Sequence, residues 1–389
     1  MHVPNEVLSR LALERLADLQ GLIEVWTDQV MALESYAGGL VPREEVREGA
    51  RIGFALILRH VAEGEVPPEL AEHSERLGER RAGQGVPLAS LLAAGRLDAR
   101  ALWQGLVERA GPEDMTELLR SAHLVWEAVE QHVTGLMAGY QRAVLEMGRQ
   151  REDQRRAWFA RLLDNDGRNP DVVRDAGQVL GFDVSGRFFV AVADPGASAE
   201  LRAAATVMAS SGLRCHRHES PTGDMLVAQP SGRVGVPEKT VLGLLGGVRC
   251  GVSPPVDELA QVPHAVRLAA AAARAAGPDT EGPQRLEERW LDVFAAHSPE
   301  LAAELAERVL GPLAAIGAAE RDRLLETVRT HLSGTGSIAD TAVALYCHRN
   351  TVQHRFARFR DLTGRDVRAP GDAAVVALAL RAAALNPAR

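Results

Sequence analysis

The feature that most constrains this chain is a long amphipathic segment that begins near residue 117. In "ELLRSAHLVWEAVEQHVTGLMAGYQRAVLEM", apolar residues recur at spacings of three and four, which predicts one long helix. The eight residues that follow, 149–156, are all polar. A solvent-exposed connector and a dimeric coiled coil both produce this pattern. We favour a connector between two domains and predict a linker helix over 149–180.

Length and composition limit the class of protein. At 389 residues the chain is too long for one ordinary core, so we expect two to four domains. Its three cysteines lie far apart and form no disulfide framework, which favours a reducing cytoplasm. The longest apolar runs, such as "GFALIL", are too short to span a membrane, and the first residues lack the apolar region of a signal peptide. We therefore expect a cytoplasmic protein with no membrane partner.

The pattern along the chain predicts a mainly α, multi-domain fold. Residues 1–148 contain amphipathic segments separated by Gly and Pro, typical of a helical bundle. From 181 to 277, the short strand-like runs "RFFVAVAD", "DMLVAQP" and "VRCGVS" alternate with helical segments, which predicts a small α/β domain ending at a Gly-Pro stop. Residues 283–389 are helical again and form a C-terminal all-α domain.

A basic segment stands out because the whole chain has a formal net charge of -8. "LYCHRNTVQHRFARFRDLTG" holds four arginines and no acidic residue before Asp361. With the residues before it, this segment has the anatomy of a helix-turn-helix: Ser337 caps a first helix, and "YCH" is a turn of suitable length. On the second helix, Val352, Phe356 and Phe359 fall on one face and form the predicted buried stripe.

The other face of that second helix is the candidate DNA-reading surface. Helical spacing directs Asn350, Gln353, His354, Ala357 and Arg358 outward, with Arg349 at the N-terminal edge and Arg355 beside the core. Arginine can pair with guanine, and Asn or Gln with adenine, in the major groove. The predicted DNA-binding residues are His348, Arg349, Asn350, Thr351, Gln353, His354, Arg355 and Arg358.

Plainer interpretations of these residues stay open. Asn350 and Gln353 fit a capping box, so Asn350 could cap the helix instead of reading a base. Arg355 could hold a phosphate or an internal carboxylate, and a phosphate contact would position the protein without specifying sequence. The whole basic face could also be merely solvated, although the matching flanks make this the least favoured interpretation.

The segment "TAVALYCHRNTVQHRFARFRDLTGRDVRAPGDAAVVALAL" resembles the C-terminal helix-turn-helix of the PucR family of bacterial transcriptional regulators, whose recognition helix opens with "HRNT". Two positions depart from the common pattern, with His354 in place of tyrosine and Ser337 in place of asparagine. Residues 181–277 resemble the degenerate GGDEF-like domain of such regulators. Residues 1–150, especially "LGERRAGQGVPLASLLAAGRLDARALW", are similar to the helical sensor-type domain shared with RsbR-like co-antagonists.

Catalysis and metal binding are weakly supported. "CHRH" at 215–218 lacks the second ligand pair of a structural zinc site, so a surface turn or strand edge is favoured. Active diguanylate cyclases need a Gly-Gly-(Asp or Glu)-Glu-Phe loop, and the corresponding turn here is "SPTGDML", with one glycine and Asp224. Cys347, beside His348 and Arg349, could be a redox switch, but a packed turn residue is favoured. We expect no enzymatic activity, no cofactor and no metal.

Taken together, these patterns predict a sequence-specific DNA-binding regulator. The N-terminal domain would sense a small-molecule or protein effector and signal through a dimeric middle domain. Because one recognition helix contacts few base pairs, we expect a homodimer or a higher even-numbered homo-oligomer on double-stranded operator DNA. The alternatives are a stress-signalling protein-interaction module and, less favoured, a nucleotide-acting enzyme. A ligand pocket could involve the bundle's aromatic and methionine residues, although plain core is favoured: Trp26, Trp103, Trp126, Met31, Met115 and Met137.

Overall fold

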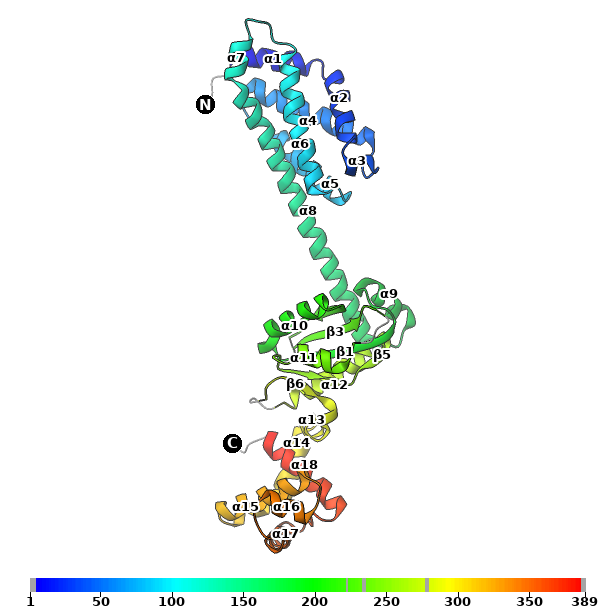
Figure 1. Cartoon of the computed structure of the whole chain (residues 1–389), viewed down its shortest axis with the longest axis vertical. Helices are drawn as coiled ribbons and strands as arrows, with labels where there is room; N and C mark the ends of the chain where they lie inside the picture. Colours follow the sequence, from blue (N-terminus) through cyan, green and yellow to red (C-terminus); the bar gives the residue numbers. More distant parts are fainter. Residues whose placement is uncertain (1–4, 222, 233–235, 277–279, 386–389) are drawn as a thin grey trace. The chain divides into compact units, whose positions relative to one another are not determined.

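A computed structural model describes residues 5–221, 223–232, 236–276 and 280–385 (Figure 1). The chain divides into two compact units, Met1–Asp153 and Gln154–Arg389. The mainly α fold expected from the sequence is confirmed, with one small sheet inside the second unit. Among the described residues, no helix has both the length and the apolar character that crossing a membrane would require.

The first unit is a helical bundle. Three of its helices begin after proline, at Pro42, Pro67 and Pro87, as the Gly and Pro punctuation predicts, and Asn5 caps the first helix. They are α1 (Glu6–Leu16), α2 (Gln20–Met31), α3 (Glu34–Ala37), α4 (Arg43–Glu63), α5 (Pro68–Gly83), α6 (Leu88–Val107), α7 (Met115–Arg120) and the first part of α8 (Ala122–Asp164).

Helix α8 is the long helix that the periodicity predicts, although it begins later than expected. The chain leaves helical geometry at Ser121, so α7 is a separate short helix. In the bundle, α8 packs directly on α5, and a Cβ on Gly139 would lie 2.0 Å from the carbonyl oxygen of Glu75. Only glycine permits this backbone contact. Beyond the bundle, α8 continues without a break through the polar stretch.

The segment 149–180 differs from the expected single linker helix. It contains the end of α8 and a second helix, α9 (Pro170–Leu180). The chain turns between them at Asp166 and Gly167, both with positive φ, and a Cβ on Gly167 would lie 1.9 Å from the carbonyl oxygen of Ala260. Phe159 and Leu162 near the end of α8 are fully buried against the neighbouring sheet domain. This part of the segment is therefore core and not solvated linker.

The middle of the chain folds into one sheet with strand order β2-β3-β1-β4-β6, while β5 pairs with β1. Strand β6 runs parallel to β4, and the other pairs are antiparallel. The strands are β1 (Ser185–Ala193), β2 (Leu213–His218), β3 (Asp224–Pro230), β4 (Cys250–Val252), β5 (Val256–Glu258) and β6 (Pro283–Arg285). The expected domain end at 277 lies outside the described residues, and 283–285, expected to be helical, form β6.

Helices cover both faces of this sheet. Along β1, Phe188 and Val190 face a core built with α8, α9 and α12 (Val262–Arg274), while Phe189 and Ala191 face α10 (Ser198–Ser210) and α11 (Glu238–Leu244). This alternation explains why β1 appears in the sequence as a continuous apolar run. Short 3-10 turns occur at Pro195–Ala197, Leu259–Gln261, Leu286–Glu288 and Gly311–Ala315.

The C-terminal part is helical. Its helices are α13 (Trp290–His297), α14 (Pro299–Leu310), α15 (Ala318–Ser333), α16 (Ile338–Ala344), α17 (Arg349–Thr363) and α18 (Pro370–Leu385). The core of this region contains Val352, Phe356 and Phe359, which are at most 1% exposed. The buried stripe predicted for the second helix of the motif is therefore confirmed.

Candidate nucleic-acid interface

The candidate interface is the helix-turn-helix formed by α16 and α17. As predicted, Ser337 caps α16, because its hydroxyl accepts a hydrogen bond from the backbone N–H of Asp340 at 3.3 Å. Between the helices, Tyr346 adopts φ 48°, and Cys347 donates its backbone N–H to the carbonyl of Ala342. The turn thus closes α16 and redirects the chain into α17.

The N-terminus of α17 differs from the capping-box alternative. His348 is the cap residue, and its Nδ1 accepts the backbone N–H of Asn350 at 3.2 Å. Asn350 is the second residue of the helix, and its side chain has no hydrogen-bond partner among the described residues. Asn350 therefore does not cap α17, and its amide is free to interact outside the protein.

A buried polar contact holds α15, α16 and α17 together. The Thr341 hydroxyl donates to the carbonyl of Ser337 at 2.7 Å, so its oxygen accepts the Nδ1–H of His331 at 3.1 Å. The His331 ring packs against Phe356, with ring centroids 4.7 Å apart, and burial lowers the pKa of His331. His331 on α15 thus contacts both helices of the motif, α16 through Thr341 and α17 through Phe356.

The outer face of α17 carries polar side chains without internal partners. In the part of the chain that the structure describes, Arg349, Thr351, Gln353 and His354 are exposed and their side chains make no hydrogen bond or ion pair. Together with Asn350 they occupy the first two turns of the helix. These turns are the ones that a recognition helix presents to base edges.

The two remaining predicted arginines have partners inside the domain. Half-buried Arg355 donates from Nη1 to the Thr327 hydroxyl on α15 at 3.0 Å, so its partner within the domain is a hydroxyl and not the internal carboxylate considered from the sequence. Arg358 pairs with Glu320 at 3.0 Å, and both side chains are more than two-fifths exposed. An exposed ion pair of this kind contributes little stability, so the pair can exchange for a phosphate at small cost.

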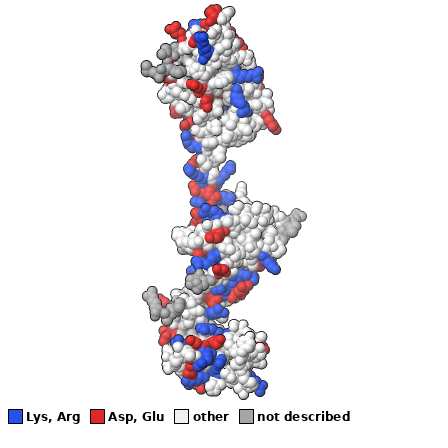
Figure 2. All heavy atoms as spheres, turned by 60° about the vertical axis from the view of Figure 1, so that its left-hand side comes forward, with Lys and Arg blue, Asp and Glu red and all other residues white. Residues whose placement is uncertain are grey.

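A groove of about 890 Å³ adjoins the start of α17. Arg349 and Gln353 line it, together with the loop before α16 and with Arg368. Arg368 is held by Asp366 through two hydrogen bonds, and this contact lowers the pKa of Asp366 to about 2. In the view of Figure 2, basic and acidic side chains are interspersed over this region, so its positive charge is local and not a uniform patch.

Sequence reasoning did not select Tyr346 as a site residue. It is 99% exposed at the tip of the turn, next to the start of α17. A large aromatic side chain held out by left-handed backbone is unusual for a residue without an external contact. Tyr346 lies inside the basic segment 345–364, which could have pointed to it. It was not selected because its side chain is aromatic and carries no charge.

The other sequence candidates fall elsewhere. "CHRH" lies on the edge strand β2. His216 is buried against Phe159, with ring centroids 4.8 Å apart, and this burial lowers the pKa of His216 to about 3. Within the described residues, no group of three or more potential ligands could hold a metal ion. Cys347 is half-buried against the C-terminal core, as a packed turn residue would be.

Three family models match consecutive parts of the chain. The RsbT co-antagonist protein rsbRD N-terminal domain matches residues 20–155, the GGDEF-like domain matches 165–275, and the PucR C-terminal helix-turn-helix domain matches 324–382. These matches confirm the resemblance that the sequence motifs predicted. The last of them contains α16, α17 and their turn.

Individual similar proteins match smaller parts. Uncharacterized proteins of Mycobacterium bovis and of two Mycobacterium tuberculosis strains are 40% identical over 78 residues, which is 20% of this chain and 18% of theirs. The aligned part is thus about a fifth of the length of these curated relatives. The crystal structure of a regulator of polyketide synthase expression from Bifidobacterium adolescentis is 24% identical, with a TM-score of 0.31, and covers 60% of this chain and 98% of its own.

Proposed function

We propose, from the PucR-family regulator architecture that this chain has, that it is a sequence-specific DNA-binding transcriptional regulator controlled by its N-terminal domain. In this proposal α17 enters the major groove. Arg349, Asn350 and Gln353 read base edges, His348, Thr351 and His354 make further contacts at the start of the helix, and Arg358 holds a phosphate.

The observation that carries the proposal is the unpartnered outer face of α17. Polar side chains that make no hydrogen bond or ion pair with the described residues, placed on the first two turns of the second helix of a helix-turn-helix, match what base readout requires. Arg355 has a different role in this proposal. It ties α17 to α15 through Thr327 and so positions the helix.

Helix α8 supports a route for the signal. Its first half contributes Val125 and Val129 to the core of the bundle, and its second half contributes Phe159 and Leu162 to the core of the middle domain. Arg155 adds backbone contacts, donating to the carbonyls of Leu180 and Cys215 at 3.3 and 3.4 Å. A change in the bundle that moves α8 would therefore act on the middle domain through a buried element.

Dimerisation is part of the proposal, because a single recognition helix reads few base pairs. The apolar stripe of α8 continues beyond the bundle, where Val144 and Leu145 are 45% and 62% exposed. Pairing of this stretch between two copies would bury them, as in a short coiled coil. The two C-terminal domains would then address a two-fold operator.

The middle domain acts in this proposal as a transmission module without catalysis. Asp224, the one carboxylate of the turn where cyclases carry their metal-binding loop, is 5% exposed and pairs with Arg217 at 3.0 Å. A carboxylate already neutralised by arginine is a poor magnesium ligand. Purified protein should accordingly show no GTP turnover at saturating magnesium, and turnover abolished by Asp224→Asn would contradict this part.

The test is DNA binding by the purified full chain. Fluorescence anisotropy with labelled DNA from upstream of its own gene, in excess non-specific competitor, should reveal a saturable specific complex. Arg349→Ala should weaken that complex by roughly 5- to 150-fold, the range that corresponds to one lost bidentate base contact. Arg308→Ala removes another exposed arginine, on α14, and should leave the affinity unchanged.

A salt titration separates the roles of the arginines. Arg358→Ala should lower the slope of log affinity against log salt by about one, because it removes a phosphate contact. Equal weakening of specific and non-specific binding by Arg349→Ala would mean that Arg349 does not read bases. The same assay is repeated with DNA fragments from the neighbouring genes. If none of them forms a specific complex, the proposed function is overturned.

A further inference from the structure

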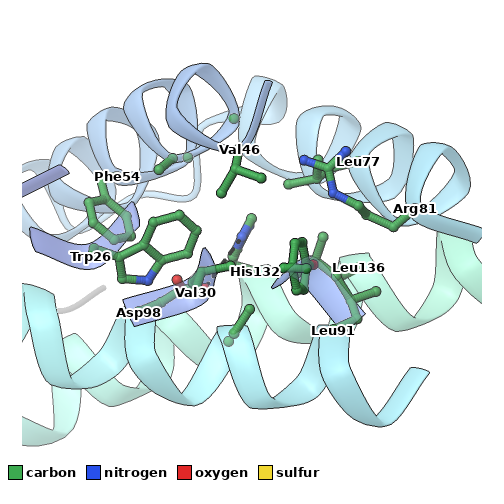
Figure 3. Close-up of a pocket in the computed structure, with 16 residues that line it drawn as sticks. Trp26, Val30, Val46, Phe54, Leu77, Arg81, Leu91, Asp98, His132 and Leu136 are labelled. Carbon is green, nitrogen blue, oxygen red and sulfur yellow. Dashed lines mark ion pairs between the residues drawn. The ribbon is translucent and has the colours of Figure 1, made fainter. Parts of the chain in front are cut away.

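The N-terminal bundle encloses a cavity of about 40 Å³ between α2, α4, α5, α6 and α8 (Figure 3). A water molecule needs roughly 10 to 15 Å³ of such space, so the cavity has room for a few waters or one very small molecule. Glycines create the space: Gly49 and Gly53 on α4 and Gly95 on α6 line it where side chains would otherwise fill the core. Of the aromatic and methionine residues considered from the sequence, only Trp26 lines this cavity.

One end of the cavity carries polar groups that the protein leaves unpaired. Asp98 is 4% exposed, and its Oδ1 has no hydrogen-bond partner among the described residues. The indole Nε1 of Trp26 faces this carboxyl (Figure 3), and although it falls outside hydrogen-bond geometry, its N–H is close enough to oppose the rise in the Asp98 pKa. A buried carboxyl without a partner is costly, and burial raises the pKa of Asp98 to about 7.

The hydrogen-bond arrangement fixes what His132 offers to the cavity. The Ser74 hydroxyl donates to the carbonyl of Leu70 at 2.5 Å, so toward Nδ1 of His132, at 2.7 Å, its oxygen can only accept. Nδ1 therefore carries the proton, and Nε2 is left as an acceptor. Burial lowers the pKa of His132 to about 3, which keeps the ring neutral.

When Asp98 is ionised, two acceptors face each other at this end of the cavity. His132 Nε2 lies 3.9 Å from Asp98 Oδ2, which is beyond hydrogen-bond reach. The one cation of the lining, Arg81, already pairs with Glu45 at 2.6 Å and lies at the other end of the cavity (Figure 3). At this end of the cavity the Trp26 indole is a donor, but no positive charge faces the Asp98 carboxylate.

The remaining walls indicate the size and character of the missing group. The rings of Trp26 and Phe54 meet edge to face, with centroids 5.4 Å apart, beside the carboxyl. Aromatic faces attract small organic cations, and tryptophan does so best. Val30, Val46 and Leu136 add apolar surface to the lining, which suits a short alkyl group.

We infer that this cavity binds a small primary ammonium cation. Its N–H groups would donate to Asp98 and to His132 Nε2, its charge would neutralise Asp98, and its short alkyl group would contact Trp26 and Phe54. Because His132 and Leu136 belong to α8, the ligand would touch the helix that also enters the middle domain. The inference deepens the proposed function by naming an effector class, and an effect of the ligand on DNA binding rests on that function.

The test measures ligand binding by the full chain in the absence of DNA. Replacing Trp158 and Trp290 with phenylalanine leaves tryptophans only in the bundle, so that their fluorescence reports on this unit. Titration with methylammonium chloride at constant ionic strength should give a saturable change. Sodium acetate and methanol, which supply an anion and a neutral donor of similar size, should give none.

Two variants locate the site. Asp98→Asn should weaken methylammonium binding by roughly 10- to 100-fold, as expected for loss of a charged hydrogen-bond acceptor. Gly53→Ala should abolish methylammonium binding, because the added methyl group would fill part of the cavity. The new Cβ would lie 3.7 Å from both His132 Cε1 and His73 Nε2, which is ordinary van der Waals contact and causes no clash. This variant should fold normally, because alanine is a better helix former than glycine.

The matched control is Gly83→Ala in α5, where an added Cβ meets nothing within 4 Å. It should bind methylammonium as the parent does. Absence of saturable binding, equal binding of methanol or acetate, or unchanged binding in Asp98→Asn and Gly53→Ala would each overturn the inference. Because no DNA is present, these outcomes are independent of whether the protein recognises an operator.

Discussion

Replacing Asp98 with asparagine should change how the stability of the N-terminal bundle depends on pH. Burial raises the folded-state pKa of Asp98 from its ordinary value of 3.8 to about 7. Between these values the folded chain keeps a proton that the unfolded chain has lost. The contribution of Asp98 to stability is therefore full below pH 3.8 and falls as the pH rises toward 7.

The magnitude follows from the size of the pKa shift. Each pKa unit corresponds to about 1.4 kcal/mol, so the wild-type carboxyl loses about 4 kcal/mol of stability across the whole window. About 3 kcal/mol of this falls between pH 5 and pH 8. Asparagine has no such titration, so the stability of Asp98→Asn minus that of the wild type should increase by about 3 kcal/mol over this range.

His132 has the opposite effect and makes the comparison sharper. Its pKa falls from 6.5 to about 3 in the folded state, so its contribution to stability rises with pH from 3 to 6.5. In the wild type the two trends largely cancel between pH 4 and pH 6.5. In Asp98→Asn the His132 trend is unmasked, and the bundle should become less stable on acidification.

The assay is urea unfolding followed by tryptophan fluorescence in the Trp158→Phe, Trp290→Phe background, at pH 5, 6, 7 and 8. Asp18→Asn, which removes an exposed carboxylate in the same unit, is the control for the loss of one negative charge. The reasoning is refuted if the Asp98→Asn difference stays constant across this pH range within about 0.5 kcal/mol. That result would mean that Asp98 titrates alike in the folded and unfolded chains.

Three further predictions concern other parts of the chain. Gly139→Ala should destabilise the bundle by about 1 to 3 kcal/mol in the same urea assay, because its Cβ would lie 2.0 Å from the Glu75 carbonyl oxygen, whereas Gly148→Ala, with open space around it, should be neutral or stabilising. Thr327→Val should lower the thermal stability of the C-terminal region by about 1 kcal/mol, since Arg355 loses its acceptor; unchanged protection of α17 in hydrogen exchange would contradict this. Val144→Glu should shift the sedimentation coefficient from dimer to monomer, and a dimer that persists would contradict pairing through α8.

The helix-turn-helix could be predicted from sequence because its determinants are local. The buried stripe of Val352, Phe356 and Phe359 follows from helical spacing, and Ser337 caps α16 as expected. The first residue of α17 was harder to predict from sequence. Both His348 and Asn350 are plausible cap residues, and the choice depends on the left-handed turn at Tyr346, which places His348 at the helix end.

The small strands were harder to predict for a physical reason. β2 is an edge strand whose His216 and His218 rings pack against Phe159 on α8, and its two buried residues, Leu213 and His216, do not follow the usual apolar alternation. β5 and β6 are three residues long and depend on partners far away in the sequence. Their pairing is a tertiary effect that no short window contains.

The cavity could not be derived from the sequence, because Gly53, Asp98 and His132 come from three helices and none has a local signature there. Its energetics nevertheless suit a sensor. The unpaired carboxyl destabilises the empty bundle by up to about 4 kcal/mol at neutral pH and above. A cation that pairs with Asp98 can recover part of this free energy, which exceeds the roughly 1 to 3 kcal/mol typical of coupling between two sites. Ligand binding can change the DNA-binding domain only through the binding free energy that differs between two arrangements of α8. The contact between the ligand and His132 on α8 would therefore decide whether binding produces a signal.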